Sequence, residues 1–322
     1  MKDLKANVDQ GNDDGRTALM RAAFCKQVKA VTTLINKYKA KVDAEDNWGA
    51  TALFFAIQEG HVDVVNALAG TFKANVEHGK KSKGERPLMT AALMGSVDIV
   101  NLLCSRHKAN VDGQNARGQT ALMYACEEGK ADIVQALAGR HKARVDIRCS
   151  KGLMALHYAA INGRHEIVDM LIGKYGANVE AVTTEDKWTA LHYAADGGSL
   201  STVKVLVNKY DANTRAVDAF GTTPLDYANE NSEQDIIKVL SDESFVVYVK
   251  AKQAGSRDRA DRADRAEKEA AEGNENKADV RLRINASTKV QRVCDVFCEK
   301  KGWSTEDVVF SCLYIKRNTK SG

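Results

Sequence analysis

A short motif returns seven times along this chain of 322 residues, at a nearly constant interval. The stretch DGRTAL at residues 14–19 returns as WGATAL at 48–53, as RGQTAL at 117–122 and as FGTTPL at 220–225. Numbered by the residue at the turn, the copies lie at Gly15, Gly49, Gly84, Gly118, Gly152, Lys187 and Gly221. An interval of 34 or 35 residues predicts a linear array of small stacked units instead of a globular domain.

Each copy has the layout of a helix pair. The turn is followed by a threonine such as Thr120, whose hydroxyl can accept a hydrogen bond from a free amide of the first helical turn. A short alanine-rich helix follows, and it ends at a glycine such as Gly129, which can adopt the left-handed conformation. The second helix carries apolar residues at i, i+1 and i+4, as in Ile133, Val134 and Leu137. One such pair cannot bury its apolar face alone, whereas stacked pairs can, so we expect a solenoid.

These units resemble the ankyrin repeat family, because the pattern Gly-x-Thr-Ala-Leu-x-x-Ala-Ala-x-x-Gly recurs over about Asn12 to Asp242. The resemblance implies a mainly α solenoid of helix pairs joined by β-hairpin turns, a non-enzymatic role and protein partners. The family histidine after the leucine occurs only as His157 and His192, so we expect the other turns to be braced less. The units are one or two residues longer than the usual repeat, and we expect the addition in the loop around Ala-Asn-Val.

The composition changes beyond the repeats. We divide the chain into an ankyrin array of about seven units over 1–243, a short β segment with a charged linker over 244–279, and a small α+β segment over 280–322. The net charge is +4, and residues 244–322 hold 17 basic against 12 acidic residues, so the whole basic excess lies there. The linker includes RDRADRADRA at 257–266, which is typical of a solvated spacer. This mild charge gives no reason to expect a nucleic acid as partner.

The last segment shows a strand, a helix and a strand in that order. Apolar residues alternate with arginines from Val280 to Ile284, a helix is predicted up to Gly302, and a further strand over 308–315. This order resembles the first part of the ubiquitin β-grasp fold, most closely the small ubiquitin-like modifier (SUMO) and its relatives, and residues 245–250 could supply the first strand. The resemblance implies a groove for an extended partner segment. Leu282 and Ile284 would line this groove. The basic residues beside it would be Arg283, Arg292 and Lys300. Because the last strand and the terminal diglycine are missing, the resemblance gives no support for conjugation to targets.

Catalytic signatures are missing from the sequence. We find no glycine-rich phosphate loop, nucleophile elbow or kinase signature, and therefore expect no enzyme activity and no cofactor. Cys294 and Cys298 are spaced to share a metal ion, but no second ligand pair follows, so core thiols are the favoured interpretation and no metal is expected. An odd number of cysteines, seven, argues against a disulfide framework. With no apolar membrane segment and no secretory signal, we expect a monomer in the cytoplasm or nucleus, away from membranes.

The clearest candidate for a site is a surface. In the resembled family the turns and the ends of the first helices face a concave groove that binds partners. Large residues fall at these positions here, and they are Trp48, Leu93, Met94, Arg117, Trp188 and Phe220. One position further into the first helix, an aromatic residue recurs in five of the seven units, and packing and binding both remain open for this row. Its members are Phe55, Tyr124, Tyr158, Tyr193 and Tyr227. The sequence therefore predicts a protein-interaction scaffold or adaptor of unknown partner, with an adaptor of the ubiquitin or SUMO pathway as the alternative.

Overall fold

The computed structural model describes residues 7–241, 244–253, 278–285 and 308–316, with side chains over 7–241. The chain forms two compact units, Met1–Leu240 and Ser241–Gly322. The first unit contains the repeats, and the second contains a small sheet.

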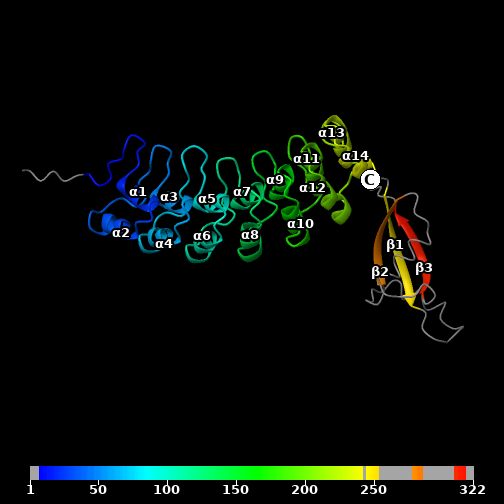
Figure 1. Cartoon of the computed structure of the whole chain (residues 1–322), viewed down its shortest axis with the longest axis horizontal. Coiled ribbons are helices and arrows are strands. Elements are labelled where there is room, and N and C mark those ends of the chain that lie inside the picture. Colours follow the sequence, from blue (N-terminus) through cyan, green and yellow to red (C-terminus); the bar gives the residue numbers. More distant parts are fainter. Residues whose placement is uncertain (1–6, 242–243, 254–277, 286–307, 317–322) are drawn as a thin grey trace, which may run out of the picture. The chain divides into compact units, whose positions relative to one another are not determined.

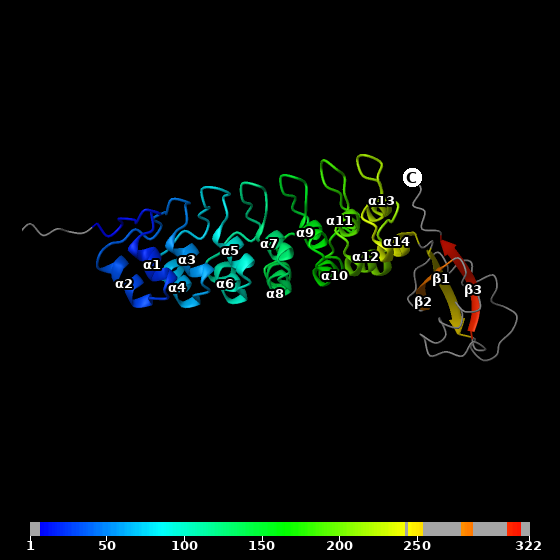
Figure 2. The same cartoon turned by 45° about the horizontal axis from the view of Figure 1, so that its top comes forward.

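The repeats form two rows of helices, with a hairpin turn leading into each helix of the first row (Figure 1 and Figure 2). The first row consists of α1 (Ala18–Phe24), α3 (Ala52–Gln58), α5 (Pro87–Met94), α7 (Ala121–Glu127), α9 (Ala155–Ile161), α11 (Ala190–Asp196) and α13 (Pro224–Glu230). The second row consists of α2 (Val28–Asn36), α4 (Val62–Asn66), α6 (Val97–Asn101), α8 (Ala131–Val134), α10 (His165–Gly173), α12 (Leu200–Lys204) and α14 (Gln234–Ser241). The predicted mainly α solenoid of helix pairs is confirmed.

The core follows the apolar pattern of the repeat. The residues predicted to face it in the second helix, Ile133, Val134 and Leu137, are at most 1% exposed. In the first helices alanines such as Ala91 and Ala125 are fully buried, so that neighbouring helices approach closely. The result is one continuous buried layer along the array, as expected when no unit can bury its apolar face alone.

The longer repeat is accommodated in the second helix, which corrects our placement of the extra residue in the Ala-Asn-Val loop. Four second helices end in π-helical turns, a wider winding that takes up an additional residue. These turns are η1 (Ala67–Thr71), η2 (Leu102–Arg106), η3 (Gln135–Arg140) and η4 (Val205–Lys209). In the third unit the amide of Ala109 donates to the carbonyl of Leu103 at 3.0 Å, a closure one residue wider than the usual Schellman bond. The first unit closes in the same way, from Ala40 to Leu34, although its helix stays α-helical.

The alanine whose amide closes the second helix is preceded by a residue in the left-handed conformation. In four units that residue is a lysine. The φ angles of Lys39, Lys73, Lys108 and Lys142 lie between 57° and 58°. The equivalent residue of the fifth unit is Gly176 at 70°. Because a side chain at positive φ is strained, these four lysines hold a conformation that glycine would adopt more readily.

Methionine replaces the missing histidine at three of the helix starts and supplies a weaker form of one of its two contacts, in line with the expectation of less bracing there. The amide of Thr120 donates to Sδ of Met123 at 3.5 Å, and Met123 donates back to the threonine hydroxyl at 3.4 Å. In the fifth unit the family histidine is present and accepts the equivalent hydrogen bond, from the amide of Met154 to Nδ1 of His157 at 3.0 Å. A sulfur atom is a weaker acceptor than an imidazole nitrogen, but it occupies the same position.

The second unit contains a three-stranded antiparallel sheet in the order β2-β1-β3. The strands are β1 (Ser244–Gln253), β2 (Ala278–Asn285) and β3 (Val308–Lys316), where strands were predicted from sequence. In the register, Val247 of β1 pairs with Leu282 of β2 and with Ile315 of β3. The predicted helix before Gly302 lies outside the described residues. Within the part of the chain that the structure describes, no helix combines the length and apolar character needed to cross a membrane.

Candidate interaction surface

Hairpin turns, here called fingers, extend beyond the first row of helices (Figure 2). Each finger is closed by a backbone bond, as from the amide of Asn115 to the carbonyl of Gln119 at 3.0 Å. Neighbouring fingers are also joined, since the amide of Ala116 donates to Lys83 and that of Ser150 to Arg117. The fingers and the first helices therefore present one continuous surface, which we call the finger face.

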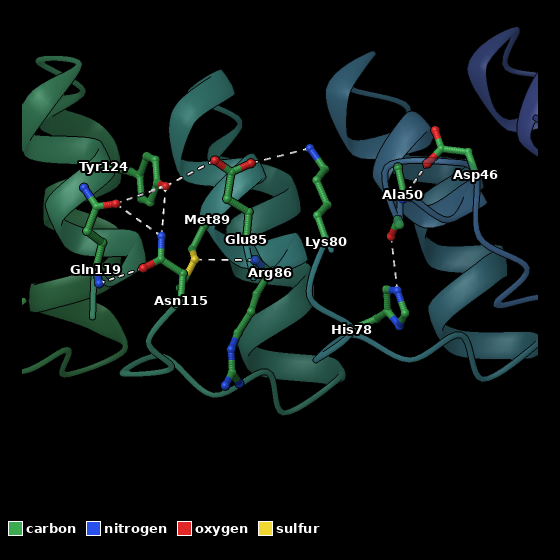
Figure 3. A network of polar contacts seen from close by, with 11 residues as sticks. Asp46, Ala50, His78, Lys80, Glu85, Arg86, Met89, Asn115, Gln119 and Tyr124 are labelled. Atoms are coloured by element: carbon green, nitrogen blue, oxygen red, sulfur yellow. Dashed lines mark hydrogen bonds and ion pairs between the residues drawn. The ribbon is translucent and has the colours of Figure 1, made fainter. Parts of the chain in front are cut away.

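Short acidic and amide side chains hold several fingers in shape. Oδ1 of Asp46 accepts from the amides of Trp48 at 3.0 Å and Ala50 at 2.8 Å, and Asn115 and Asp218 do the same in later units. In the next unit, Lys80 and Glu85 form an ion pair of 3.6 Å, which Figure 3 shows beside the first of these fingers. The fingers are thus rigid platforms for the residues at their tips.

Four of the six residues predicted for the groove are exposed on the finger face. Trp48 is 50% exposed and Phe220 is 78% exposed, each directly before the turn glycine of its finger. Arg117 is exposed at the equivalent place, and Met94 is 43% exposed at the end of α5. Leu93, the fifth, is partly buried. Ile161, which the sequence reasoning missed, lies at the end of α9 and is 40% exposed.

Trp188 is placed differently from the tip residue that we predicted. Its ring packs between Tyr193 and Tyr227, with centroid distances of 4.8 and 4.6 Å, and stacks on His192. Its Nε1 donates to Oδ2 of Asp218 at 3.2 Å. The reason is its position in the repeat: Trp48 precedes the turn residue of its finger, whereas Trp188 follows it and points back toward the first helices. Trp188 therefore joins two units to each other.

An aromatic residue recurs at the same place in five of the seven units, and its tyrosines brace the fingers. Figure 3 shows Tyr124 between Glu85 and Asn115, where its hydroxyl accepts from the asparagine at 3.1 Å and donates to the glutamate at 3.3 Å. Burial, and then the nearby Glu85, raises the pKa of Tyr124 to about 12, so the hydroxyl stays protonated. Gln119 donates to the hydroxyl of Tyr158 at 3.0 Å across a unit boundary. Phe55 and Tyr193 are buried or partly buried in the same row. These contacts favour packing over binding for this row.

The buried titratable groups are part of the packing. Burial, and then Glu77, raises the pKa of Cys104 to about 12, so this thiol is protonated at neutral pH and is a poor nucleophile. Burial lowers the pKa of His157 to about 4, and its Nε2 contacts the carbonyl of Ala181 at 3.0 Å. Over the described ranges, no three His, Cys, Asp or Glu side chains are grouped to hold a metal ion.

The predicted groove of the last segment stays a prediction. Leu282, Arg283 and Ile284 lie on β2, opposite Val247, Val246 and Phe245 in the register, and their side chains are not among those described. Arg292 and Lys300 fall outside the described residues, as do Cys294 and Cys298.

Comparison with known families agrees with the geometry. A family model for ankyrin repeats in three copies matches residues 34–115, 70–150, 88–183 and 156–251, and the model for a single ankyrin repeat matches residues 14–47. Together these matches cover most of the chain, and they end before the β2 segment. No curated protein matches the chain.

Proposed function

The chain belongs to the ankyrin repeat family, whose repeats generally bind other proteins, and from this we propose that it is a protein-interaction scaffold whose partner lies across the finger face. The observation that carries the proposal is the row of exposed large apolar side chains at finger tips and first-helix ends. Trp48, Met94, Ile161 and Phe220 lie there, in the second, third, fifth and seventh units. Aromatic residues on rigid elements are typical of binding hot spots.

In the middle units of this face, opposite charges lie in two rows, whereas the fingers of the first and sixth units carry exposed acidic residues, Asp13, Glu185 and Asp186. Exposed basic residues lie at or beside the finger tips, as Lys83, Arg117 and Lys151 do. Exposed acidic residues lie at the ends of the first helices, as Glu128 and Asp196 do. A partner segment running along the middle units would meet positive charge on one side and negative charge on the other, which favours one orientation there.

Photo-crosslinking can test which face binds. A photoreactive phenylalanine analogue placed at Met94 or Ile161 should crosslink a partner in cells, because both side chains are exposed on the finger face. Matched control sites are Asp98 and Glu166, which are exposed on the second row of helices. The captured protein, once purified, should bind the Trp48→Ala variant at least about tenfold more weakly, since a hot-spot residue contributes about 2 kcal/mol or more. Crosslinks that come equally from the control sites, or unchanged affinity of the variant, would refute the proposal.

A further inference from the structure

A hollow of about 390 Å³ lies on the finger face between the first two units. Two arginines and two phenylalanines line it: Arg16 comes from the first finger, Arg21 and Phe24 from α1, and Phe55 from α3. We propose that this hollow binds an acidic side chain of a partner peptide together with the apolar residue next to it. The proposal rests on the proposed protein-binding role of this face and names the chemistry of one part of the partner.

Arg16 is held in place with its hydrogen-bond donors accessible. Its guanidinium lies 5.7 Å from the ring centroid of Trp48 and 5.3 Å from that of Phe55, so two aromatic rings orient it. Its ion pair with Asp14 is long, at 3.8 Å, and both side chains are about half exposed, at 48% and 47%. A guanidinium that stacks on rings keeps its planar fork of donors free for a carboxylate. An incoming carboxylate can therefore replace this weak pair with a bidentate one.

Arg21 is a second cation, and no acidic side chain among the described residues pairs with it. It lies over the ring of Phe24, at 5.4 Å from the centroid, and over the described residues it has no hydrogen bond or ion pair to another side chain. The two arginines come from one unit and both border the hollow. Together they favour a negative group and disfavour a basic peptide.

The wall of the hollow is aromatic and fixed. Phe24 and Phe55 meet edge to face, with centroids 6.5 Å apart, and Phe55 is only 9% exposed. The carbonyl of Phe24 contacts Nε2 of His61 at 3.0 Å, which ties the end of α1 to the second unit. Because Phe55 is almost covered already, an apolar side chain next to the bound carboxylate would cover the exposed part of Phe24 and exclude water from the charged contact. The combination selects an acidic residue adjacent to a large apolar one.

The experiment is a selection of displayed random peptides of twelve residues on the full chain. We expect enriched sequences with Asp or Glu beside Phe, Trp, Tyr or Leu. A fluorescent synthetic peptide with the enriched sequence should bind Arg21→Gln at least about tenfold more weakly, as measured by anisotropy. Replacing its acidic residue by the matching amide should weaken binding to a similar degree, and the two changes together should cost little more than one, because they remove the same contact.

Arg106→Gln is the matched control, since this exposed arginine lies at the end of η2 in the second row of helices, outside the finger face, and it should change the affinity less than twofold. Arg16→Gln is not used alone because it also removes the contacts with Trp48 and Phe55. No enriched motif, a neutral or basic motif, or equal affinity for Arg21→Gln and the wild type would overturn the proposal. Such a failure leaves crosslinking from Met94 and Ile161 intact, whereas failure of the proposed function removes it.

Discussion

Trp188→Ala and Trp48→Ala should differ sharply in their effect on stability, although both tryptophans flank a finger turn. Trp188 packs against three rings and donates to Asp218. Removing a buried tryptophan costs about 3–5 kcal/mol, and because Trp188 is only partly buried we expect the lower end, about 3 kcal/mol. Trp48 is half exposed and contacts Arg16 at 5.7 Å, so its loss should cost about 1 kcal/mol or less.

Urea unfolding followed by circular dichroism measures this difference without depending on tryptophan fluorescence. With a slope of about 3 kcal/mol per M, Trp188→Ala should lower the midpoint by about 1 M, and Trp48→Ala by about 0.3 M or less. Since each unit is stabilised mainly by its neighbours, the loss should be largest in the sixth and seventh units, and their amides should exchange faster. Equal shifts for the two variants, or a larger shift for Trp48→Ala, would refute the assignment of Trp188 to packing.

Three further predictions concern other parts of the structure. Lys108→Gly should raise stability by about 1 kcal/mol because it relieves a left-handed lysine, whereas Lys204→Gly, inside α12, should lower it by about as much; loss of stability in both would contradict the reasoning. His157 has a pKa of about 4 when folded and about 6.5 when unfolded, so its contribution is complete above pH 6.5 and is lost as the pH falls toward 4, by about 3 kcal/mol. His157→Met introduces the residue that other units have at this position, and it should flatten the dependence of the free energy of unfolding on pH between 6.5 and 4, as measured by urea titrations. An unchanged pH dependence would count against this role of His157. Gly173→Ala should destabilise by about 1–2 kcal/mol because its new Cβ would lie 2.5 Å from the hydroxyl of Tyr210, and Tyr210→Phe should recover part of the loss; a silent Gly173→Ala would show that the contact can relax.

The repeat was readable from the sequence because each unit must present the same apolar positions to its neighbours. The spacing of Ile133, Val134 and Leu137 predicts a helix and its buried face together, and the structure confirms both. Periodic information of this kind exists only where every unit meets the same environment. That is why helices and core were predictable, and why the individual surface contacts were not.

Features particular to one unit escaped prediction for physical reasons. Trp188 was predicted at a tip because it flanks the turn residue Lys187, although it follows that residue, whereas Trp48 and Phe220 precede theirs. The sulfur acceptor of Met123 was missed because methionine at an apolar position indicates core packing. The hollow lined by Arg21 and Phe55 combines two units, and no spacing within one repeat indicates it.

The position of the extra residue in each repeat could not be predicted from the sequence either. A repeat longer by one residue can lengthen a loop or widen a helix, and both choices keep the same period. In the structure the extra residue widens the end of the second helix, as the hydrogen bond from the amide of Ala109 to the carbonyl of Leu103 shows. This choice depends on how the end of the second helix packs on the next unit, which the sequence of a single unit does not express.

Hydrogen exchange of the whole chain, with and without the protein captured by crosslinking, measures whether that partner covers the finger face. We expect slower exchange in the fingers around Trp48 and Arg117 and at the helix end around Ile161, with unchanged exchange in the second-row helices α6 and α10. Protection confined to α6 and α10, with no change in the fingers, would contradict that expectation.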